Sequence, residues 1–288
     1  MTDSLYTAAA HASAAAVIAH YSTSFGTSTR LLAPELRTPI RSIYALVRVA
    51  DEVVDGSAAQ AGLSLAEQRR QLDDLENETV RALDCGFSTN LIVHAFADVG
   101  RRYGISPSLT APFFASMRRD LDSAPLADGE LGSYIHGSAE VVGLMCLRVF
   151  VAGVSYSPEQ HRVLEAGATR LGAAFQKVNF LRDLAADAGQ LGRNYLPGVQ
   201  GAALTETTKN ALLDDIDDDL LAAEEAITLL PRGSRVAVAT AARLFARLAE
   251  KLRRTPAERL MVTRVRVTDA AKLGIAARTA LSSGGRRP

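Results

Sequence analysis

Two segments of the chain place acidic side chains at the spacing of an α-helix. In the first, Tyr44, Arg48, Asp51 and Asp55 follow one another at intervals of four, three and four residues. Residues three or four apart lie on one face of a helix, so these side chains form a single polar stripe. The positions between them are mostly apolar, which indicates a helix that is otherwise packed into a core.

The second segment repeats this arrangement later in the chain. Gln176, Asn179, Asp183 and Asp187 are spaced by three, four and four residues, and apolar side chains occupy much of the rest of the segment. Both stripes therefore end in two aspartates that are four residues apart.

Carboxylates crowded in this way favour a divalent cation. Like charges at this spacing repel one another, and burial makes the repulsion more costly unless a cation is present. If the two stripes face each other across a cavity, their oxygen atoms suit Mg²⁺, which keeps some of its waters and bridges to phosphate groups. We therefore expect a diphosphate ligand, whose other oxygens would be bound by the guanidinium groups of Arg48, Arg182 and Arg193.

Other acidic patterns in the chain point elsewhere. A single occurrence of two aspartates four residues apart usually marks a solvated helix face. The interpretation as a cation site therefore depends on there being two matched stripes. The denser acidic run at 214–219 has no matching partner, so we expect it to open a surface helix and to face solvent. A di-iron bundle needs Glu-x-x-His pairs, and none of the five histidines has a glutamate three residues before it.

The elements that would position these stripes are helices. Alanine and leucine dominate, tryptophan is absent, and apolar residues recur at the helical period. We expect a single all-α domain over 1–288, with a core at about 10–280, a loop at 188–202, a disordered tail at 282–288, and an extended turn or helix at 262–268. The predicted helices cover 8–32 with a break near Gly26, 40–55 starting after Pro39, 64–84, 90–103, 108–122, 129–153, 158–187, 205–230, 232–254 and 256–280.

Composition limits the partners and the compartment. Lysine plus arginine and aspartate plus glutamate both number 32, so there is no basic field that would attract nucleic acid. Apolar runs are too short for a membrane span, and the Ala-rich start lacks the basic residues of a secretory signal. We expect a cytoplasmic protein in which Cys85 and Cys146 are buried free thiols.

At this point the sequence resembles the squalene and phytoene synthase family, the head-to-head prenyl synthases, and within it the bacterial phytoene synthases. The resemblance covers about residues 20–275, and the motif at 171–197 is its most specific part. It is carried by Ser22-Thr23-Ser24-Phe25, by the stripe from Tyr44 to Asp55, by Tyr134 to Gly143, by 171–197 (LGAAFQKVNFLRDLAADAGQLGRNYLP), and by Thr263 to Val267.

The resemblance implies an all-α isoprenoid-synthase bundle around a central cavity. It implies Mg²⁺, with Mn²⁺ as a substitute, held by Asp51, Asp55, Asn179, Asp183 and Asp187. The same aspartates, with Tyr44 and Arg48, would be catalytic. Substrate would be bound by Ser22, Ser24, Tyr134, Gln176, Arg182, Arg193, Tyr195 and Arg264. Two positions depart from the family: Phe245 stands where a tyrosine is common, and Tyr21 where some relatives have histidine.

The function implied is the condensation of two geranylgeranyl diphosphates, through a cyclopropyl (prephytoene) diphosphate, to phytoene in carotenoid biosynthesis, without NADPH. Peripheral membrane contact and a downstream desaturase as partner are further expectations. A synthase of squalene, dehydrosqualene or presqualene diphosphate that uses farnesyl diphosphate remains an alternative. So does a non-catalytic helical scaffold. A head-to-tail synthase would carry D-D-x-x-D, whereas residues 51–55 read DEVVD.

Overall fold

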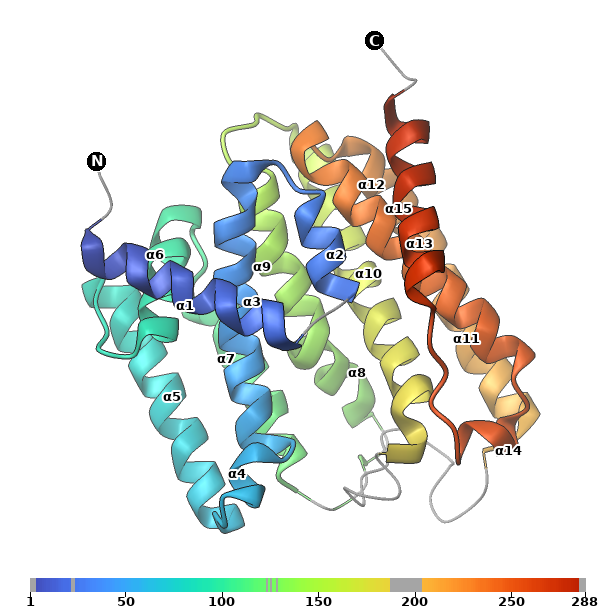
Figure 1. Ribbon diagram of the computed structural model, residues 1–288, viewed down its shortest axis with the longest axis horizontal. Coiled ribbons are helices and arrows are strands. Elements are labelled where there is room, and N and C mark those ends of the chain that lie inside the picture. Colours follow the sequence, from blue (N-terminus) through green and yellow to red (C-terminus); the bar gives the residue numbers. More distant parts are fainter. Residues whose placement is uncertain are drawn as a thin grey trace.

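The computed structural model describes residues 4–21, 24–122, 124, 126–127, 129–186 and 204–284, and within these ranges it contains helices and no strand (Figure 1). The elements are α1 (Leu5–Tyr21), α2 (Ser24–Arg30), α3 (Pro34–Val54), α4 (Ser57–Gln60), α5 (Leu65–Cys85), α6 (Leu91–Tyr103), α7 (Pro107–Asp120), α8 (Glu130–Ile135), the π-helical turn η1 (His136–Glu140), α9 (Val141–Phe150), α10 (Pro158–Ala186), α11 (Glu206–Ala222), α12 (Glu224–Leu229), α13 (Arg232–Arg254), α14 (Ala257–Leu260) and α15 (Asp269–Gly284). The all-α fold class is confirmed.

Local capping residues explain where several helices begin and end. Ser64 and Glu67 form the reciprocal capping box that opens α5, at the start of the helix predicted for 64–84. Gly86 closes α5 in a left-handed conformation that glycine adopts without strain. Asn90 opens α6 by accepting hydrogen bonds from two backbone N–H groups.

Three predicted boundaries differ from the structure. Helix α3 begins at Pro34, so Pro39 lies inside it, because a proline in the first turn already provides the start. The break in 8–32 falls after Tyr21, and Gly26 is helical. The predicted helix at 256–280 is interrupted between Leu260 and Asp269, where β-branched residues alternate with polar ones and lower the helix propensity.

The helices form two packed groups, and α10, the longest helix, belongs to the second of them. One hydrophobic core joins α3, α5, α6, α7 and α9, and a second joins α10 with α11 and α13. Where α10 meets the η1–α9 wall, a Cβ on Gly143 would lie 2.8 Å from the carbonyl oxygen of Ala168, and one on Gly172 equally close to that of Ala139. These glycines let the two backbones approach closely. In the part of the chain described, each helix is too short or too polar to cross a lipid bilayer.

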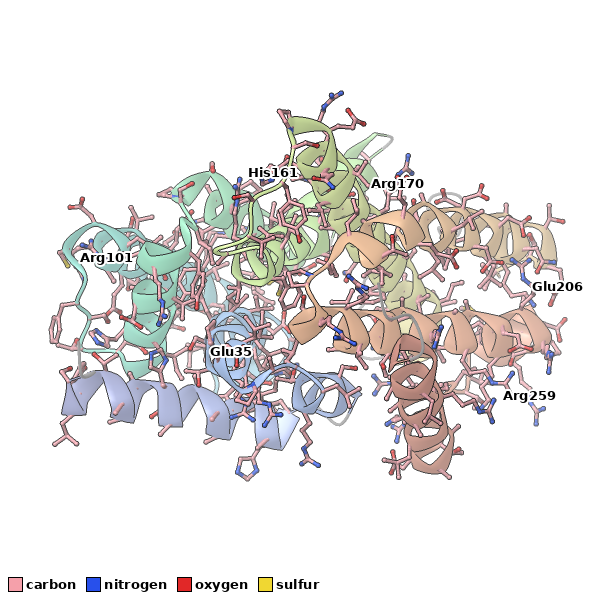
Figure 2. All side chains as sticks on the ribbon, turned by 90° about the horizontal axis from the view of Figure 1, so that it is seen from above. Glu35, Arg101, His161, Arg170, Glu206 and Arg259 are labelled. Atoms are coloured by element: carbon pink, nitrogen blue, oxygen red, sulfur yellow. The ribbon has the colours of Figure 1, made fainter. Side chains whose placement is uncertain are left out.

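The acidic run at 214–219 is not all solvated, contrary to expectation. Asp219 is only 1% exposed, and its carboxylate pairs with Lys177 at 2.7 Å and with Arg170 at 2.9 Å. Figure 2 shows Arg170 on the outside of the bundle. The run lies in the second half of α11, because this helix already starts at Glu206, and one of its acids therefore faces the cations of α10.

The two thiols also differ from the expectation that both are buried. Cys85 ends α5 on the surface and is exposed, whereas Cys146 on α9 is half-buried in the wall of the cavity described below. At the carboxyl end, α15 continues through Gly284, three residues into the expected tail, and residues 285–288 lie outside the described part.

Candidate active site

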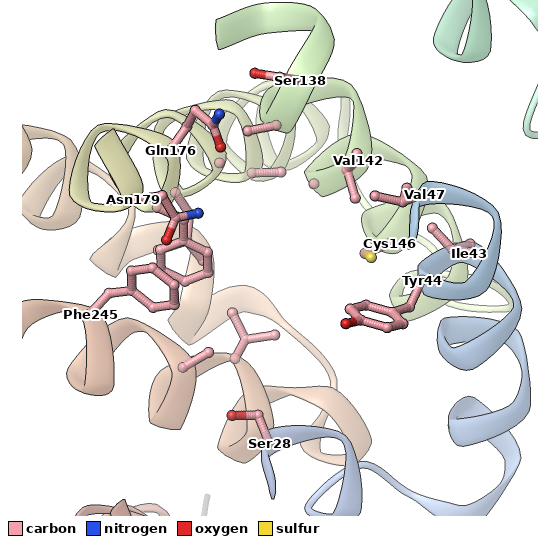
Figure 3. Close-up of a pocket in the computed structure, with 18 of the residues that line it drawn as sticks. Ser28, Ile43, Tyr44, Val47, Ser138, Val142, Cys146, Gln176, Asn179 and Phe245 are labelled. Atoms are coloured by element: carbon pink, nitrogen blue, oxygen red, sulfur yellow. The ribbon is translucent and has the colours of Figure 1, made fainter. Parts of the chain in front are cut away.

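A cavity of about 590 Å³ lies between the two packed groups of helices. Helix α3 forms one side, and α10 and α13 form the other. Helices α8 and α9 with the turn η1 close it between them, and α2 and α12 also contribute. Figure 3 shows Gln176 and Asn179 reaching into this space from the side opposite Tyr44. The two stripes predicted from the sequence therefore border one cavity.

Most of the predicted site residues border this cavity. Those that do are Tyr44, Arg48, Asp51, Asp55, Tyr134, Gln176, Asn179, Arg182, Asp183 and Arg264. Ser22, Asp187, Arg193 and Tyr195 lie outside the described residues. Ser24 begins α2, but its side chain is also outside the described part.

The α3 side of the cavity carries one arginine among several acids. Arg48 pairs with Asp51, at 3.6 Å between nitrogen and oxygen, and with Glu52 one turn away. Its guanidinium carbon also lies 4.4 Å from the centre of the Tyr21 ring. Glu52 is held in addition by the hydroxyl of Ser57 at the start of α4. Arg48 is thus engaged by protein groups on several sides, while its Nε is buried without a partner among the described residues.

Asp51 is the carboxylate that the protein environment perturbs most clearly. About 30% of its side chain remains accessible, from the cavity. Burial nevertheless raises its pKa from 3.8 to about 8, and the neighbouring carboxylate of Asp55 adds to this increase. Without a further cation, the site therefore penalises the charged form of Asp51.

On the α10 side, two arginines converge on one aspartate. The Nε of Arg182 donates to Asp183 at 2.9 Å, and the Nε of Arg264 lies 2.7 Å from the same carboxylate. Arg264 comes from the segment between α14 and α15, so this segment contributes a side chain to the site. This position agrees with the sequence prediction that Arg264 lies at the site. The predicted ligand of Arg264 is the substrate, whereas the residue it contacts in the structure is Asp183.

The available donors fit Mg²⁺ shared with a phosphate group better than a closed metal cage. Asn179 presents a buried Oδ1 that has no hydrogen-bond partner among the described residues. In the described part of the chain, no three acidic, histidine or cysteine side chains converge closely enough to hold an ion by themselves. Mg²⁺ is commonly bound by one or two carboxylates together with substrate phosphates, and this site offers such a partial set of oxygens.

Sequence reasoning missed two acids at the site. Asp120 ends α7, is 6% exposed, and accepts a hydrogen bond of 2.7 Å from the hydroxyl of Tyr134. It borders the cavity and adds to the raised pKa of Asp51. Glu52, the second residue of DEVVD, was passed over because it lies outside the stripe. Asp120 has no partner at helical spacing in the sequence, so only its three-dimensional position reveals it.

Beyond the polar residues, the cavity is apolar. Phe175 and Phe245 stack with ring centroids 3.8 Å apart, so the position that departs from the family motif contributes an aromatic face. Thr29 on α2 is buried and borders the cavity. The other apolar lining residues come from α3, α9, α10, α12 and α13 and include Ile40, Ile43, Val142, Leu147, Phe150, Leu164, Leu171, Ile227, Leu230 and Val238. Such a wall suits hydrocarbon chains.

Comparison with known proteins agrees with the family resemblance seen in the sequence. Residues 18–271 match the family model described as squalene/phytoene synthase. A 15-cis-phytoene synthase of Paracoccus sp. is 27% identical over 88% of this chain and 85% of the relative. A phytoene synthase of Mycobacterium bovis is 31% identical over 58% of this chain, and the match spans about half of that protein (51%). The resemblance seen in the sequence is confirmed.

Solved structures agree at the level of the fold. A dehydrosqualene synthase solved with a ligand superposes with a TM-score of 0.79 over 97% of this chain and 98% of the other, at 20% identity. The squalene synthase HpnC from Alicyclobacillus acidocaldarius superposes with a TM-score of 0.73, over 88% and 96% of the two chains, at 18% identity.

Proposed function

Because the chain belongs to the squalene/phytoene synthase family, we propose that it joins two prenyl diphosphates head to head. One observation carries this proposal: a single cavity has acids, amides and arginines at one end and an apolar wall along the remainder. A prenyl diphosphate has the same division between a charged head and a hydrocarbon tail. A non-catalytic scaffold would need neither part.

The substrate we propose is geranylgeranyl diphosphate, and the product is phytoene. The phytoene synthases of Paracoccus sp. and Mycobacterium bovis are 27% and 31% identical to this chain. The residues of α10 that line the cavity run from Leu164 to Asp183, which at 1.5 Å per residue is about 28 Å of helix. A lining of this length leaves room for a twenty-carbon chain. The fold neighbours that act as squalene or dehydrosqualene synthases keep the fifteen-carbon alternative open.

The cofactor we propose is Mg²⁺, or Mn²⁺ in its place, with no requirement for NADPH. Asp51, Asp55, Asn179 and Asp183 are the described residues that would hold it, and Asp187 would complete the set. When bound, Mg²⁺ supplies neutralisation of the diphosphate charge, which makes diphosphate a leaving group. The all-oxygen donor set is the reason for preferring this ion over Zn²⁺.

The protein's own groups bind the head and protect the cation that forms. Arg48, Arg182 and Arg264 can turn their guanidinium groups from carboxylates to diphosphate oxygens. The apolar wall excludes water from the allylic cation that is left when the C1–O bond breaks. Tyr44 and Tyr134 line the same space, where an aromatic face stabilises positive charge.

The thiol in the cavity wall is kept in its less nucleophilic form. Burial raises the pKa of Cys146 to about 12, so its thiol stays protonated at neutral pH. The cation can therefore add to the C2=C3 double bond of the second prenyl chain, which leaves a tertiary cation. Loss of a proton from C1 of the first chain, taken up by the departed diphosphate, then closes the ring of the cyclopropyl diphosphate. A second ionisation, rearrangement and proton loss would then give the hydrocarbon.

We further propose a cytoplasmic enzyme that touches membranes and passes its product to a desaturase. Substrate and product are long hydrocarbons that must move between lipid and the cavity. Val262, Leu273 and Leu281, in and before α15, are large apolar side chains each exposed over more than half of their surface. Flotation with liposomes tests this contact, and a protein that stays at the bottom of the gradient at low and physiological salt would contradict it.

Product analysis tests the function. The purified protein would be incubated with Mg²⁺ and farnesyl or geranylgeranyl diphosphate, alone and in competition, with and without NADPH. We expect phytoene from geranylgeranyl diphosphate in the absence of NADPH. Exclusive use of the C15 substrate, or an absolute need for NADPH, would assign the chain to the squalene branch. No product from either substrate would favour the scaffold.

A further inference from the structure

The wall of the cavity contains one π-helical turn, η1, between α8 and α9. Its hydrogen bonding is widened, since the N–H of Val141 donates to the carbonyl of His136, five residues earlier. Such turns are rare and are frequent at functional sites. Here the turn changes which side chain faces the cavity.

Neighbouring helices hold this turn tightly on both sides. A Cβ on Gly137 would lie 2.2 Å from the carbonyl oxygen of Pro112 on α7. On the other side, Gly172 of α10 packs against the backbone of Ala139. Ser138, between Gly137 and Ala139, borders the cavity, and Figure 3 shows it on the wall formed by η1 and α9.

The hydroxyl of Ser138 is buried, yet it has no hydrogen-bond partner among the described residues. A helical serine commonly donates to the carbonyl four residues earlier. In this wall that carbonyl belongs to Tyr134, and it already accepts the Ser116 hydroxyl at 3.1 Å. A buried polar group without a partner destabilises the fold, and an alanine at this position would avoid the cost.

The position of Ser138 suggests what its partner is. Tyr134, one turn before it, borders the cavity and donates to the carboxylate of Asp120, whereas Val142, one turn after it, is an apolar lining residue. Ser138 therefore lies on the stretch of wall where a bound prenyl diphosphate would change from charged head to hydrocarbon. That boundary is the C1–O bond, which breaks when the substrate ionises.

We propose that Ser138 is a further catalytic residue, whose buried hydroxyl turns into the cavity when substrate binds and donates a hydrogen bond to the diphosphate oxygen that leaves C1 of the bound prenyl chain. This inference rests on the proposed function. When the C1–O bond breaks, its electron pair stays on the diphosphate oxygen and the positive charge stays on the allylic carbon. The serine keeps its proton and stabilises the developing negative charge, as donors aimed at a leaving oxygen do.

The experiment compares Ser138→Ala and Ser138→Val, which lack the hydroxyl, with Ser138→Thr, which keeps it. Ser133→Ala is the matched control, because Ser133 is an exposed serine of the adjoining α8. Diphosphate release would be measured with whichever prenyl diphosphate the wild type consumes. We expect the Ala and Val variants to lose about tenfold in kcat with little change in KM. The Thr variant should stay within about threefold of wild type, and Ser133→Ala should match wild type.

Thermal unfolding of the ligand-free protein separates this role from a structural one. Ser138→Ala removes an unpaired buried hydroxyl, so its Tm should equal or exceed that of wild type although its turnover falls. Unchanged kcat in the Ala and Val variants, or a Tm loss that parallels the loss of activity, would overturn the inference. Release of a prenyl alcohol by the wild type would also overturn the inference. The Ser138 hydroxyl would then be binding a water molecule that attacks the allylic cation. A wild type that releases no diphosphate from either substrate would instead refute the proposed function.

Discussion

At the scale of single residues, each arginine of the site is paired with an acid of the site. Asp183 is shared by Arg182 and Arg264, and Arg48 is shared by Asp51 and Glu52. These arginines and aspartates are the groups proposed for diphosphate and Mg²⁺. Binding both ligands would therefore exchange these internal ion pairs for contacts with the ligands.

Replacing a single carboxylate at this site should stop turnover without unfolding the protein. We expect Asp51→Asn and Asp183→Asn each to lower kcat by far more than about tenfold, since every 1.4 kcal/mol of lost charge stabilisation costs a factor of ten. The helical circular dichroism should be retained. Asp218→Asn, in the exposed part of α11, is the control and should behave as wild type. Either site variant keeping more than about a tenth of wild-type activity would contradict a shared metal.

Residues at helical spacing are what a sequence can reveal about such a site. The stripes of α3 and α10 could be predicted because each repeats at three or four residues beside apolar positions. Asp120 and Ser138 could not, because each reaches the cavity through the packing of α7 or through a π-helical turn, and neither leaves a periodic signal. The burial of Asp219 was missed for the same reason: its partners lie on another helix.

At the scale of elements, close contact between α10 and the η1–α9 wall fixes the shape of the cavity. The start of the helix predicted at 64–84 agrees with α5, which Ser64 caps. The predicted helix start at Pro39 was wrong, because Pro34 already opens α3. The continuous helix predicted at 256–280 was also wrong, whereas the extended turn expected within it at 262–268 agrees with the break between α14 and α15. Contacts between helices were not predictable, because glycine in a helix has no distinctive pattern until the facing backbone is known.

Two helical glycines test this close contact. Gly172→Ala would place a Cβ 2.8 Å from one backbone atom of the wall and 2.9 Å from another. We expect it to destabilise the fold by about 1–3 kcal/mol, seen as a lower Tm. Gly132→Ala on α8 meets nothing within 4 Å and should be neutral or stabilising by about 0.5–1 kcal/mol. Equal Tm values for the two variants would mean that the backbones do not approach as described.

At the scale of the whole molecule, the two packed groups of helices meet at the cavity, so ligands that bridge them should stabilise the entire fold. A ligand that binds only the folded state raises its stability by about 2.7 kcal/mol at a hundred times its dissociation constant. We expect inorganic diphosphate and Mg²⁺ together to raise Tm by more than the sum of their separate effects.

The metal requirement can be tested by activity. Zn²⁺ should replace Mg²⁺ poorly, and EDTA should abolish turnover. Full activity in EDTA would refute the metal assignment.

The length of the cavity, a property of the whole bundle, should decide which prenyl chain is used. Thr29 is only 3% exposed and borders the cavity, where a small side chain leaves space. Each buried CH₂ contributes about 0.8 kcal/mol, so five extra carbons strongly favour the longer chain when they fit. Thr29→Phe fills that space, and we expect it to shift the preference in competition from geranylgeranyl toward farnesyl diphosphate. Arg30→Phe adds the same ring at an exposed position of α2 and should leave the ratio unchanged. An unaltered ratio in Thr29→Phe would show that this part of the cavity does not receive the end of the chain.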